Sequence, residues 1–260
     1  MSNASILLLN LGVVFVLTTA LWAVSVALKD TSIVDIFWGS GFVVIAWVTY
    51  AVADGAPPRK LLLAGLTTLW GLRLTIHLAR RNLGKGEDFR YAAMRRRHGD
   101  RWPLRSLWAV FWGQGILMWI VSLPVQAGQF DPTPAHLTWF DGLGVAIFAV
   151  GFFFETVGDL QLERFKADPA STGQVMDRGL WRYTRHPNYF GDFAVWWGLY
   201  DIALATGSAW WTVIGPLVMS VLLIRVSGAG LLEKSIGRRR PGYDEYVRRT
   251  SGFLPLPPRR

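Results

Sequence analysis

Residues 6–28 read ILLLNLGVVFVLTTALWAVSVAL, an uncharged and almost wholly apolar run. About 20 such residues are enough for a helix to cross the hydrocarbon core of a bilayer. The run lacks the basic residues that precede the apolar core of a secretory signal, and its length suits a span better than a cleavable segment. It therefore predicts a first transmembrane helix, and the rest of the chain can be searched for the same pattern.

Six further windows come close to the length and apolarity of a span. The chain of 260 residues is 52% hydrophobic and has 14 tryptophans, a balance too apolar for an ordinary soluble domain. We expect an all-α polytopic membrane protein, a bundle of seven transmembrane helices with short cytoplasmic helices. A turn expected around Gly207 and Ser208 separates the last two windows, with one long merged helix as the alternative. The six windows are Ile33–Ala53, Leu61–Ala79, Leu107–Gln126, Trp139–Leu160, Phe190–Ala205 and Trp210–Val226.

Lysines and arginines fall mainly into three segments and give the chain a formal net charge of +9. Loops rich in these residues stay in the cytoplasm, and an odd number of spans puts all three segments on one side. We expect an integral protein of the bacterial inner membrane, with the N-terminus outside and the C-terminus cytoplasmic. The segments contain Arg80, Arg81, Lys85, Arg90, Arg95, Arg96, Arg97, Arg101 and Arg105; then Arg164, Lys166, Arg178, Arg182 and Arg185; then Lys234, Arg238, Arg239, Arg240, Arg248, Arg249, Arg259 and Arg260.

The basic residues leave two interpretations open. They could serve topology and attract anionic lipid, at about 1 kcal/mol for each residue near the surface. Alternatively, the Asp, Glu, Asn, His and Tyr interleaved with them indicate a site for an anionic ligand. A nucleic-acid role is not expected, because no recognised binding motif occurs and the aromatic residues lie mainly in the spans.

Several kinds of chemistry are excluded by what the sequence lacks. There is no cysteine, so thiol catalysis and thiolate metal sites are absent. No glycine-rich dinucleotide fingerprint, phosphate-binding loop or HExxH motif is present, and no G-x-S-x-G motif occurs. The four histidines show no paired ligand spacing, so we expect no metal site.

The densest polar block, residues 178–192, reads RGLWRYTRHPNYFGD. Pro187 suits the first turn of a helix, and the N-terminus of that helix, with free backbone N–H groups, favours an anion. Asn188 and Asp192 are four residues apart and share a helix face. The alternative is a capped helix with interfacial aromatic residues. The residues grouped around this helix start are Arg182, Arg185, His186, Asn188, Tyr189 and Asp192.

Three smaller constellations lie on the same predicted side of the membrane. Glu155, Asp159, Glu163 and Lys166 share one helical face, where Asp159 could accept hydrogen bonds from a ligand and Lys166 could meet a phosphate. Their alternative is an ion pair with Arg182 or Arg185. The block Glu87–Tyr91 contains Arg90 and Tyr91. The tail helix expected after Pro241 contains Tyr243 and Arg248. Together these segments suit a polyanionic cofactor such as NADPH.

With these residues in view, the chain resembles the steroid 5-alpha-reductase family, in particular bacterial members with a steroid-reductase-like C-terminal domain. The wider relatives are the sterol reductase and isoprenylcysteine methyltransferase-like membrane proteins. The resemblance rests on Asp159–Lys166, on residues 179–192 and on the stretch from Arg240-Pro241-Gly242-Tyr243 to Pro255. It implies one membrane domain, in which residues 1–135 shape a substrate pocket and residues 136–260 bind the cofactor.

The resemblance further implies an NADPH-dependent reductase that transfers hydride to the C=C bond of a lipid-like enone, such as a 3-oxo-delta-4 steroid. We expect a monomer with a lipophilic small-molecule substrate, in contact with membrane lipid. Glu233 stands where relatives keep a His or an acidic residue. The cofactor contacts carried over by position are Arg90, Tyr91, Asp159, Lys166, Asn188, Asp192 and Tyr243.

The catalytic residues are less well marked, because the family's Gln-Glu pair and its partner Tyr are not recognisable in this sequence. The polar candidates in the early spans are Asp35, Trp38, Arg73 and His77. Hydride transfer to an enone builds negative charge on the carbonyl oxygen, and a donor must stabilise it. Asp35 could be that donor if burial keeps it protonated. The alternative is that Asp35 pairs with Arg73 or His77.

Two other function classes stay open at this point. Membrane methyltransferases similar to the isoprenylcysteine carboxyl methyltransferases share the run Arg185-His186-Pro187-x-Tyr189-x-Gly191 and an acidic position like Glu233. They use S-adenosylmethionine, whose small net charge needs fewer arginines. A non-enzymatic lipid-binding protein would bind neither cofactor.

Overall fold

The structure, a computed structural model, describes residues 1–226 and 242–259. Within these ranges it is helical and has no strand, only an isolated bridge between Thr184 and Ser251. The all-α fold class is therefore confirmed for the described residues. The chain divides into two compact units, Met1–Thr138 with Ala203–Ile214 and Trp139–Ile202 with Gly215–Arg260. The assignment of residues 1–135 to substrate and 136–260 to cofactor stays a prediction.

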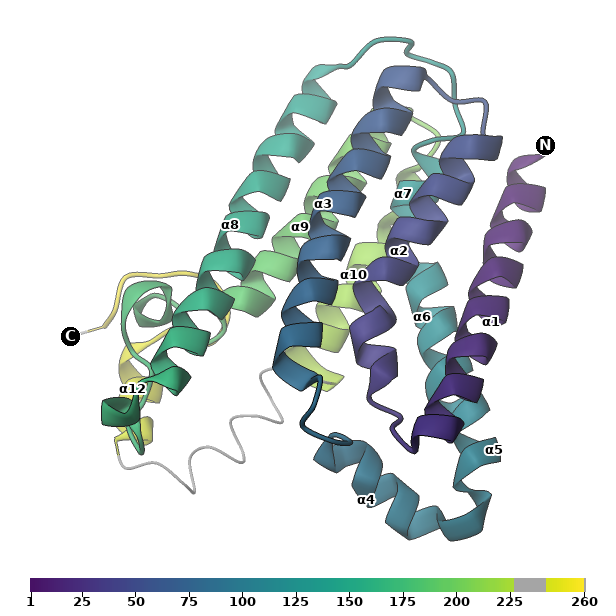
Figure 1. Cartoon of the computed structure of the whole chain (residues 1–260). Coiled ribbons are helices and arrows are strands. Elements are labelled where there is room, and N and C mark those ends of the chain that lie inside the picture. The colour runs from purple at the N-terminus through teal and green to yellow at the C-terminus, as the bar shows by residue number, and fades with distance from the viewer. Residues whose placement is uncertain (227–241, 260) are drawn as a thin grey trace. The chain divides into compact units, whose positions relative to one another are not determined.

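Unit 1 is built on three long helices, α1 (Asn3–Leu28), α2 (Ile33–Val52) and α3 (Pro57–Asn82), which lie side by side in Figure 1. Short pieces follow, and a π-helical turn at Leu107–Trp112 precedes α6. These pieces are α4 (Phe89–His98), a 3-10 turn (Gly99–Arg101), α5 (Trp102–Ser106), α6 (Gly113–Val121) and α7 (Leu123–Ala127); the 3-10 turn Trp210–Val213 also belongs to this unit.

Unit 2 contains α8 (Trp139–Ala167) and α9 (Pro187–Leu204), which lie next to each other in Figure 1. Pro187 is the first residue of α9, as the sequence predicted. The remaining elements are two 3-10 turns at Pro169–Ser171 and Gly179–Arg182, α10 (Ile214–Val221), a π-helical turn (Leu222–Val226) and α12 (Tyr243–Arg249).

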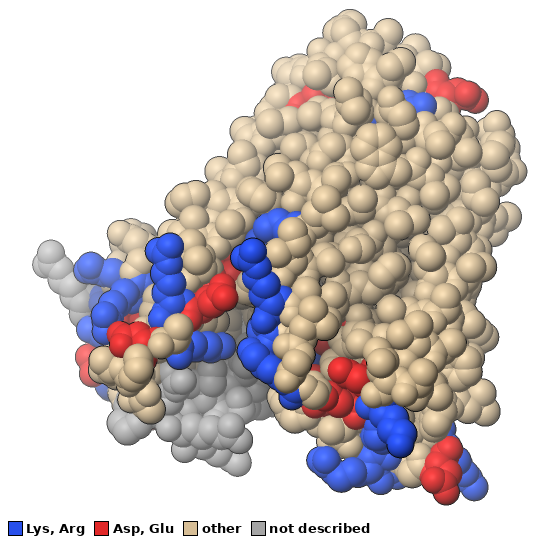
Figure 2. Space-filling view, in the orientation of Figure 1, with Lys and Arg blue, Asp and Glu red and all other residues tan. Residues whose placement is uncertain are grey.

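Among the described residues, five helices are long and apolar enough to cross a membrane: α1, α2, α3, the broken helix Phe89–Val121 and α8. The chain is thus an integral membrane protein with transmembrane helices. On the face that Figure 2 shows, the upper part is mostly uncharged, and the charged side chains gather mainly in the lower part. The predicted count of seven spans is not confirmed, because α9 carries Asp192 and Asp201 and the helix Trp210–Arg225 is short. The orientation of the termini stays a prediction.

The break between the last two predicted spans is present. α9 ends at Leu204, and Gly207 adopts a positive φ of 72° before the turn at Trp210. The single merged helix is therefore wrong. The fourth predicted span, Leu107–Gln126, is helical but interrupted, since its first six residues are π-helical and α6 ends before Ser122.

Glycines bring α8 and α9 into close contact. Gly144 faces Gly198, and Gly151 faces Gly191; a Cβ atom on any of the four would lie 2.6 Å from the carbonyl oxygen of the opposite glycine. Small residues let helix backbones approach in this way, so that dispersion contacts hold the pair together without a hydrophobic driving force from water. We call these four residues the glycine seam. It fixes the register of α8 against α9.

We predict that Gly191→Ala destabilises the protein by about 1–3 kcal/mol, because the added methyl group must push backbone aside. The matched control is Gly142→Ala on α8, where a Cβ meets nothing within 4 Å and alanine should add about 0.5–1 kcal/mol. Thermal unfolding in detergent compares the two variants with the wild type. Equal transition temperatures for Gly191→Ala and Gly142→Ala would contradict the seam.

Candidate functional site

The carboxylate of Asp35, in the first turn of α2, joins three helices of unit 1. Its Oδ1 accepts a hydrogen bond from the Tyr91 hydroxyl at 2.7 Å, and its Oδ2 pairs with Arg90 Nη2 at 2.9 Å. Gln114 Nε2 from α6 donates to the Tyr91 oxygen at 3.1 Å. Tyr91 is 6% exposed, so its hydroxyl is held at a fixed place inside the unit. We call Asp35, Arg90, Tyr91 and Gln114 the tyrosine site.

The start of α4 explains why Arg90 and Tyr91 point to Asp35. Asp88 caps the helix by accepting from the backbone N–H of Arg90 at 2.9 Å, and it also accepts from Arg90 Nε at 2.8 Å. The guanidinium is therefore shared between Asp88 and Asp35. The next residue, Tyr91, lies on the inner face of α4. The alternative considered from the sequence, in which Asp35 pairs with Arg73 or His77, is not found.

A second set of contacts holds α4 against the turn between α1 and α2. Both carboxylate oxygens of Glu87 accept from Arg95, at 2.8 and 2.9 Å, and one of them accepts from the backbone N–H of Thr31 at 2.9 Å. Trp102 Nε1 donates to Thr31 Oγ1 at 3.2 Å. Burial alone would raise the pKa of Glu87, but the hydrogen bonds from Arg95 and Thr31 outweigh it and leave the pKa below its usual value.

The other predicted catalytic residues lie along α2 and α3. Trp38 packs edge-on against Phe42 with ring centroids 5.4 Å apart, and Phe42 packs in the same way against Trp70 at 5.5 Å. Trp38 is thus part of the aromatic packing between these helices. Arg73 and His77 are half-buried and one turn apart on α3. The structure brings Asp35 together with Arg90 and Tyr91. The other three predicted catalytic residues do not join this group of contacts.

In unit 2, the start of α9 is bound to α8 through one polar pair. Asp159 of α8 is 8% exposed, and its Oδ1 accepts from Asn188 Nδ2 at 2.9 Å. Gly158 allows the approach, since a Cβ there would lie 3.2 Å from the backbone N of Asn188. The Gly158 carbonyl accepts from Trp181 Nε1 at 3.0 Å. Two predicted cofactor contacts, Asp159 and Asn188, are therefore adjacent.

The loop before α9 supports the C-terminal segment. Arg185 Nη1 donates to the carbonyl oxygens of Val247 at 3.0 Å and Thr250 at 3.3 Å, at the end of α12. The Tyr246 hydroxyl donates to the Trp181 carbonyl at 2.6 Å. Tyr243 is buried and lies beside Tyr246. These contacts give Arg185 a structural role that its sequence context did not reveal. The helical spacing of Tyr243 and Tyr246 predicted that both aromatic rings pack inward, and both are buried.

The remaining predicted cofactor contacts differ in exposure. His186 is buried and stacks on Tyr189 with ring centroids 5.4 Å apart, while Asp192 is half-buried on α9. Lys166, Arg182 and Arg248 are exposed. Among the described residues, Arg182 and Arg248 form no ion pair. Glu233 lies outside the described residues.

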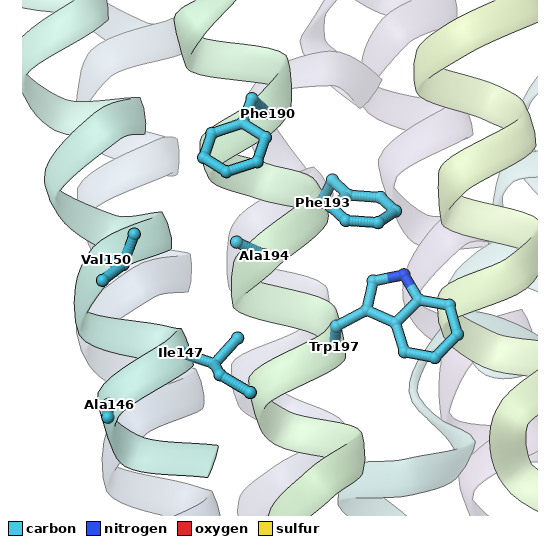
Figure 3. A pocket seen from close by; sticks show the side chains of 7 residues that line it. All are labelled: Ala146, Ile147, Val150, Phe190, Phe193, Ala194 and Trp197. Atoms are coloured by element: carbon cyan, nitrogen blue, oxygen red, sulfur yellow. The ribbon is translucent and has the colours of Figure 1, made fainter. Parts of the chain in front are cut away.

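An apolar groove lies between α8 and α9 (Figure 3), with a volume of about 350 Å³. Its walls carry no titratable group. The groove could accept a hydrocarbon chain, but it cannot supply a proton or a charge. It is lined by Ala146, Ile147, Val150, Phe190, Phe193, Ala194 and Trp197.

Sequence reasoning did not identify Gln114 or Thr31 as parts of a site. Gln114 could have been noticed, because it is a polar residue inside the apolar window Leu107–Gln126 and such residues are costly in a membrane. Thr31 gave no such signal. Its contacts depend on the fold of α4 and α5, which no local pattern specifies.

Comparison with known proteins gives two matches and one negative result. The family model described as "Protein of unknown function (DUF1295)" matches residues 21–250. An uncharacterized protein of Schizosaccharomyces pombe is 26% identical over 282 residues, covering 97% of this chain and 80% of the yeast protein. No solved structure matches.

We predict that Glu87→Gln lowers the free energy of unfolding at pH 7 by about 1–3 kcal/mol, because the hydrogen bonds to a charged carboxylate are lost. The pKa of Glu87 is lowered by folding, so its contribution is present above its unfolded pKa of about 4.3 and is lost as the pH falls through the folded value. The wild type should therefore lose this contribution to stability as the pH falls. The variant, which lacks the Glu87 carboxylate, should show a smaller loss of stability in acid.

Thermal unfolding in detergent between pH 3 and pH 7 measures this difference. The control is Glu163→Gln, the same change at an exposed glutamate on α8. If Glu87→Gln and Glu163→Gln have the same stability and the same dependence on pH, the Glu87 contacts do not stabilise the protein.

Proposed function

The chain belongs to the family described as protein of unknown function DUF1295, which includes steroid 5-alpha-reductase-like membrane proteins, and on that premise we propose that it is an NADPH-dependent membrane reductase. Its substrate would be a lipid-like enone, with a 3-oxo-delta-4 steroid as the first candidate. The observation that carries the proposal is the buried Tyr91 hydroxyl, which is oriented by Asp35 and Gln114.

The cofactor, when bound, supplies a hydride to the β-carbon of the enone. Negative charge then grows on the carbonyl oxygen, and a fixed donor stabilises it best when no reorganisation is needed. In this proposal the Tyr91 hydroxyl turns from Asp35 Oδ1 to that oxygen, while Gln114 continues to donate to the phenolic oxygen. The ion pair with Arg90 makes Asp35 an acceptor that positions Tyr91. This differs from the expectation that a protonated Asp35 is itself the donor.

The residues of unit 2 suit a phosphate-bearing cofactor. Phosphates need cations that are not already neutralised by carboxylates, and the exposed Arg182 and Arg248 have no ion pair among the described residues. We propose that these two arginines hold phosphate groups, and the cofactor contact expected at Lys166 stays a prediction. Asp159, oriented by Asn188, would accept hydrogen bonds from a hydroxyl or an amide. Arg90 is less suited, because Asp35 and Asp88 share its charge.

We predict that NADPH raises the unfolding temperature of the purified protein, since a ligand that binds the folded state stabilises it by mass action. Arg182→Gln and Arg248→Gln should each cost about 1.5–3 kcal/mol of binding, which is roughly tenfold or more in Kd. Thermal shift titrations in detergent with NADPH, NADH and S-adenosylmethionine measure this. Arg97→Gln is the matched control, because it removes an exposed charge from unit 1 outside the proposed contacts.

The same titration separates the alternatives. A response to S-adenosylmethionine alone would replace the reductase by a methyltransferase similar to the isoprenylcysteine carboxyl methyltransferases. No response to any of the three cofactors would favour a non-enzymatic lipid-binding protein. Equal weakening of NADPH binding by Arg97→Gln and Arg182→Gln would show that only net charge matters, and would refute the assignment of Arg182.

We predict that Tyr91→Phe lowers kcat for NADPH oxidation with progesterone by about 10²-fold or more, the usual range for loss of one oxyanion donor. The ring is kept, so binding of NADPH should not change. Tyr50→Phe on α2 is the control for removing a hydroxyl from unit 1. A Tyr91→Phe variant with unaltered kcat would rule out Tyr91 as the donor.

A further inference from the structure

The outer face of α4 presents apolar and cationic side chains together. Phe89 is 78% exposed and Met94 is 43% exposed, although both are large and hydrophobic. Ala93, Arg96 and Arg97 are exposed beside them. The buried Tyr91 lies on the side of the helix opposite Phe89 and Ala93. We call Phe89, Ala93, Met94, Arg96 and Arg97 the outer face of α4.

The contacts of α4 fix its depth in the membrane. Thr31 lies in the turn between α1 and α2, two helices that are long and apolar enough to span a bilayer. Such a turn has to lie where the chain leaves the hydrocarbon. Glu87, Arg95 and Trp102 all bind Thr31, at 2.9, 3.3 and 3.2 Å. α4 is therefore held at the level of the membrane surface.

The orientation of α4 is consistent with a place at the membrane surface. Gly99 ends the helix with a positive φ of 52°, which glycine adopts without strain. α4 consequently does not continue into α5 as one straight helix, and in Figure 1 it runs crosswise at the ends of α1 and α2. A helix that lies in the interface plane can put apolar side chains into the acyl boundary and cations among the headgroups.

The segment after α4 also exposes apolar and cationic side chains together. Trp108 is 53% exposed, and the Arg105 guanidinium lies over its ring, 5.7 Å from the centroid. Leu104 is 68% exposed. Tryptophan is enriched at the boundary between membrane and water, and an arginine beside it can reach a phosphate while its stem covers apolar surface. The interfacial surface thus extends from α4 into α5.

Within the described part of the chain, no carboxylate compensates the charge of this surface. Glu87 binds Arg95, and Asp35 with Asp88 bind Arg90, on the inner side of α4. Arg96, Arg97 and Arg101 form no ion pair with any residue of the described part of the chain. Arg96 and Arg97 lie on the same helix as the exposed Phe89 and Met94, and Arg101 ends the 3-10 turn that follows this helix. These guanidinium groups are complementary in charge to a layer of lipid phosphates.

We propose that the outer face of α4, with Arg101, binds anionic phospholipid. The headgroup phosphate would pair with Arg96, Arg97 and Arg101, and Phe89 and Met94 would enter the acyl boundary. A soluble phosphate would satisfy the arginines but would leave both apolar side chains in water. A phospholipid carries a phosphate and acyl chains in one molecule. It therefore explains why cationic and apolar side chains occur together on this helix.

The test uses the absence of cysteine from the chain. Ala93→Cys provides a single attachment point for an environment-sensitive fluorophore on α4. The labelled full-length protein in detergent is titrated with dioctanoyl phosphatidylglycerol, dioctanoyl phosphatidylcholine, glycerol phosphate and NADPH. We expect a saturable blue shift with phosphatidylglycerol. Arg96→Gln and Arg97→Gln should each weaken its binding about fivefold, given about 1 kcal/mol for each basic residue at a membrane surface.

The control is the pair Arg164→Gln and Arg178→Gln, which removes the same charge from exposed sites of unit 2 and should leave the titration unchanged. Equal responses to phosphatidylglycerol and phosphatidylcholine would overturn the proposal. A shift with glycerol phosphate or NADPH alone would also overturn it, in favour of a soluble anion. The thermal shift titration with NADPH tests the proposed cofactor site of unit 2, and the fluorescence titration tests the lipid site on α4. A negative result in one titration therefore refutes one proposal without refuting the other.

Discussion

The carboxylate of Asp35 is the contact on which the organisation of unit 1 depends. It binds the hydroxyl of Tyr91 and the guanidinium of Arg90, and so joins α2 to α4. The bond orients the hydroxyl for which we propose a catalytic role. It also holds α4 at the ends of α1 and α2, with the outer face turned away from Asp35. One acidic group therefore contributes to the proposed chemistry inside and to the proposed lipid surface outside.

Unit 2 is organised by close backbone approach. The glycine seam lets α8 and α9 meet, and about two turns after Gly151 on α8, Gly158 gives the start of α9 room beside α8. The Asp159–Asn188 hydrogen bond forms at that place. A larger residue in the seam would shift α9 and with it the polar residues of its first turn. Packing and site geometry are thus connected through residues that have no side chain.

The sequence predicted the features that have local signals. Apolar runs located α1, α2, α3 and α8 to within a few residues at most ends, and Pro187 marked the start of α9. The count of spans was less predictable, because α9 is a short helix for a span and carries Asp192 and Asp201.

The contacts of the site depended on tertiary structure. Arg90, Tyr91, Asp159 and Asn188 were singled out, but their contacts were not. Asp35 was considered as a proton donor or as a partner of Arg73 or His77, and it binds Arg90 and Tyr91. Arg185 was grouped with the predicted cofactor contacts, and it binds the end of α12. Pairing between helices depends on how the elements pack, and a single sequence has no local pattern for it.

The most direct test of the central claim, that the Tyr91 hydroxyl donates to the substrate carbonyl, is isotope-edited infrared spectroscopy of progesterone labelled with ¹³C at its enone carbonyl. With wild-type protein and oxidised cofactor, we expect a lower carbonyl stretching frequency than in an apolar solvent, because the hydrogen bond from Tyr91 weakens the C=O bond. In Tyr91→Phe the frequency should return toward the solvent value. The same frequency in both proteins would show that the Tyr91 hydroxyl does not donate to the substrate carbonyl.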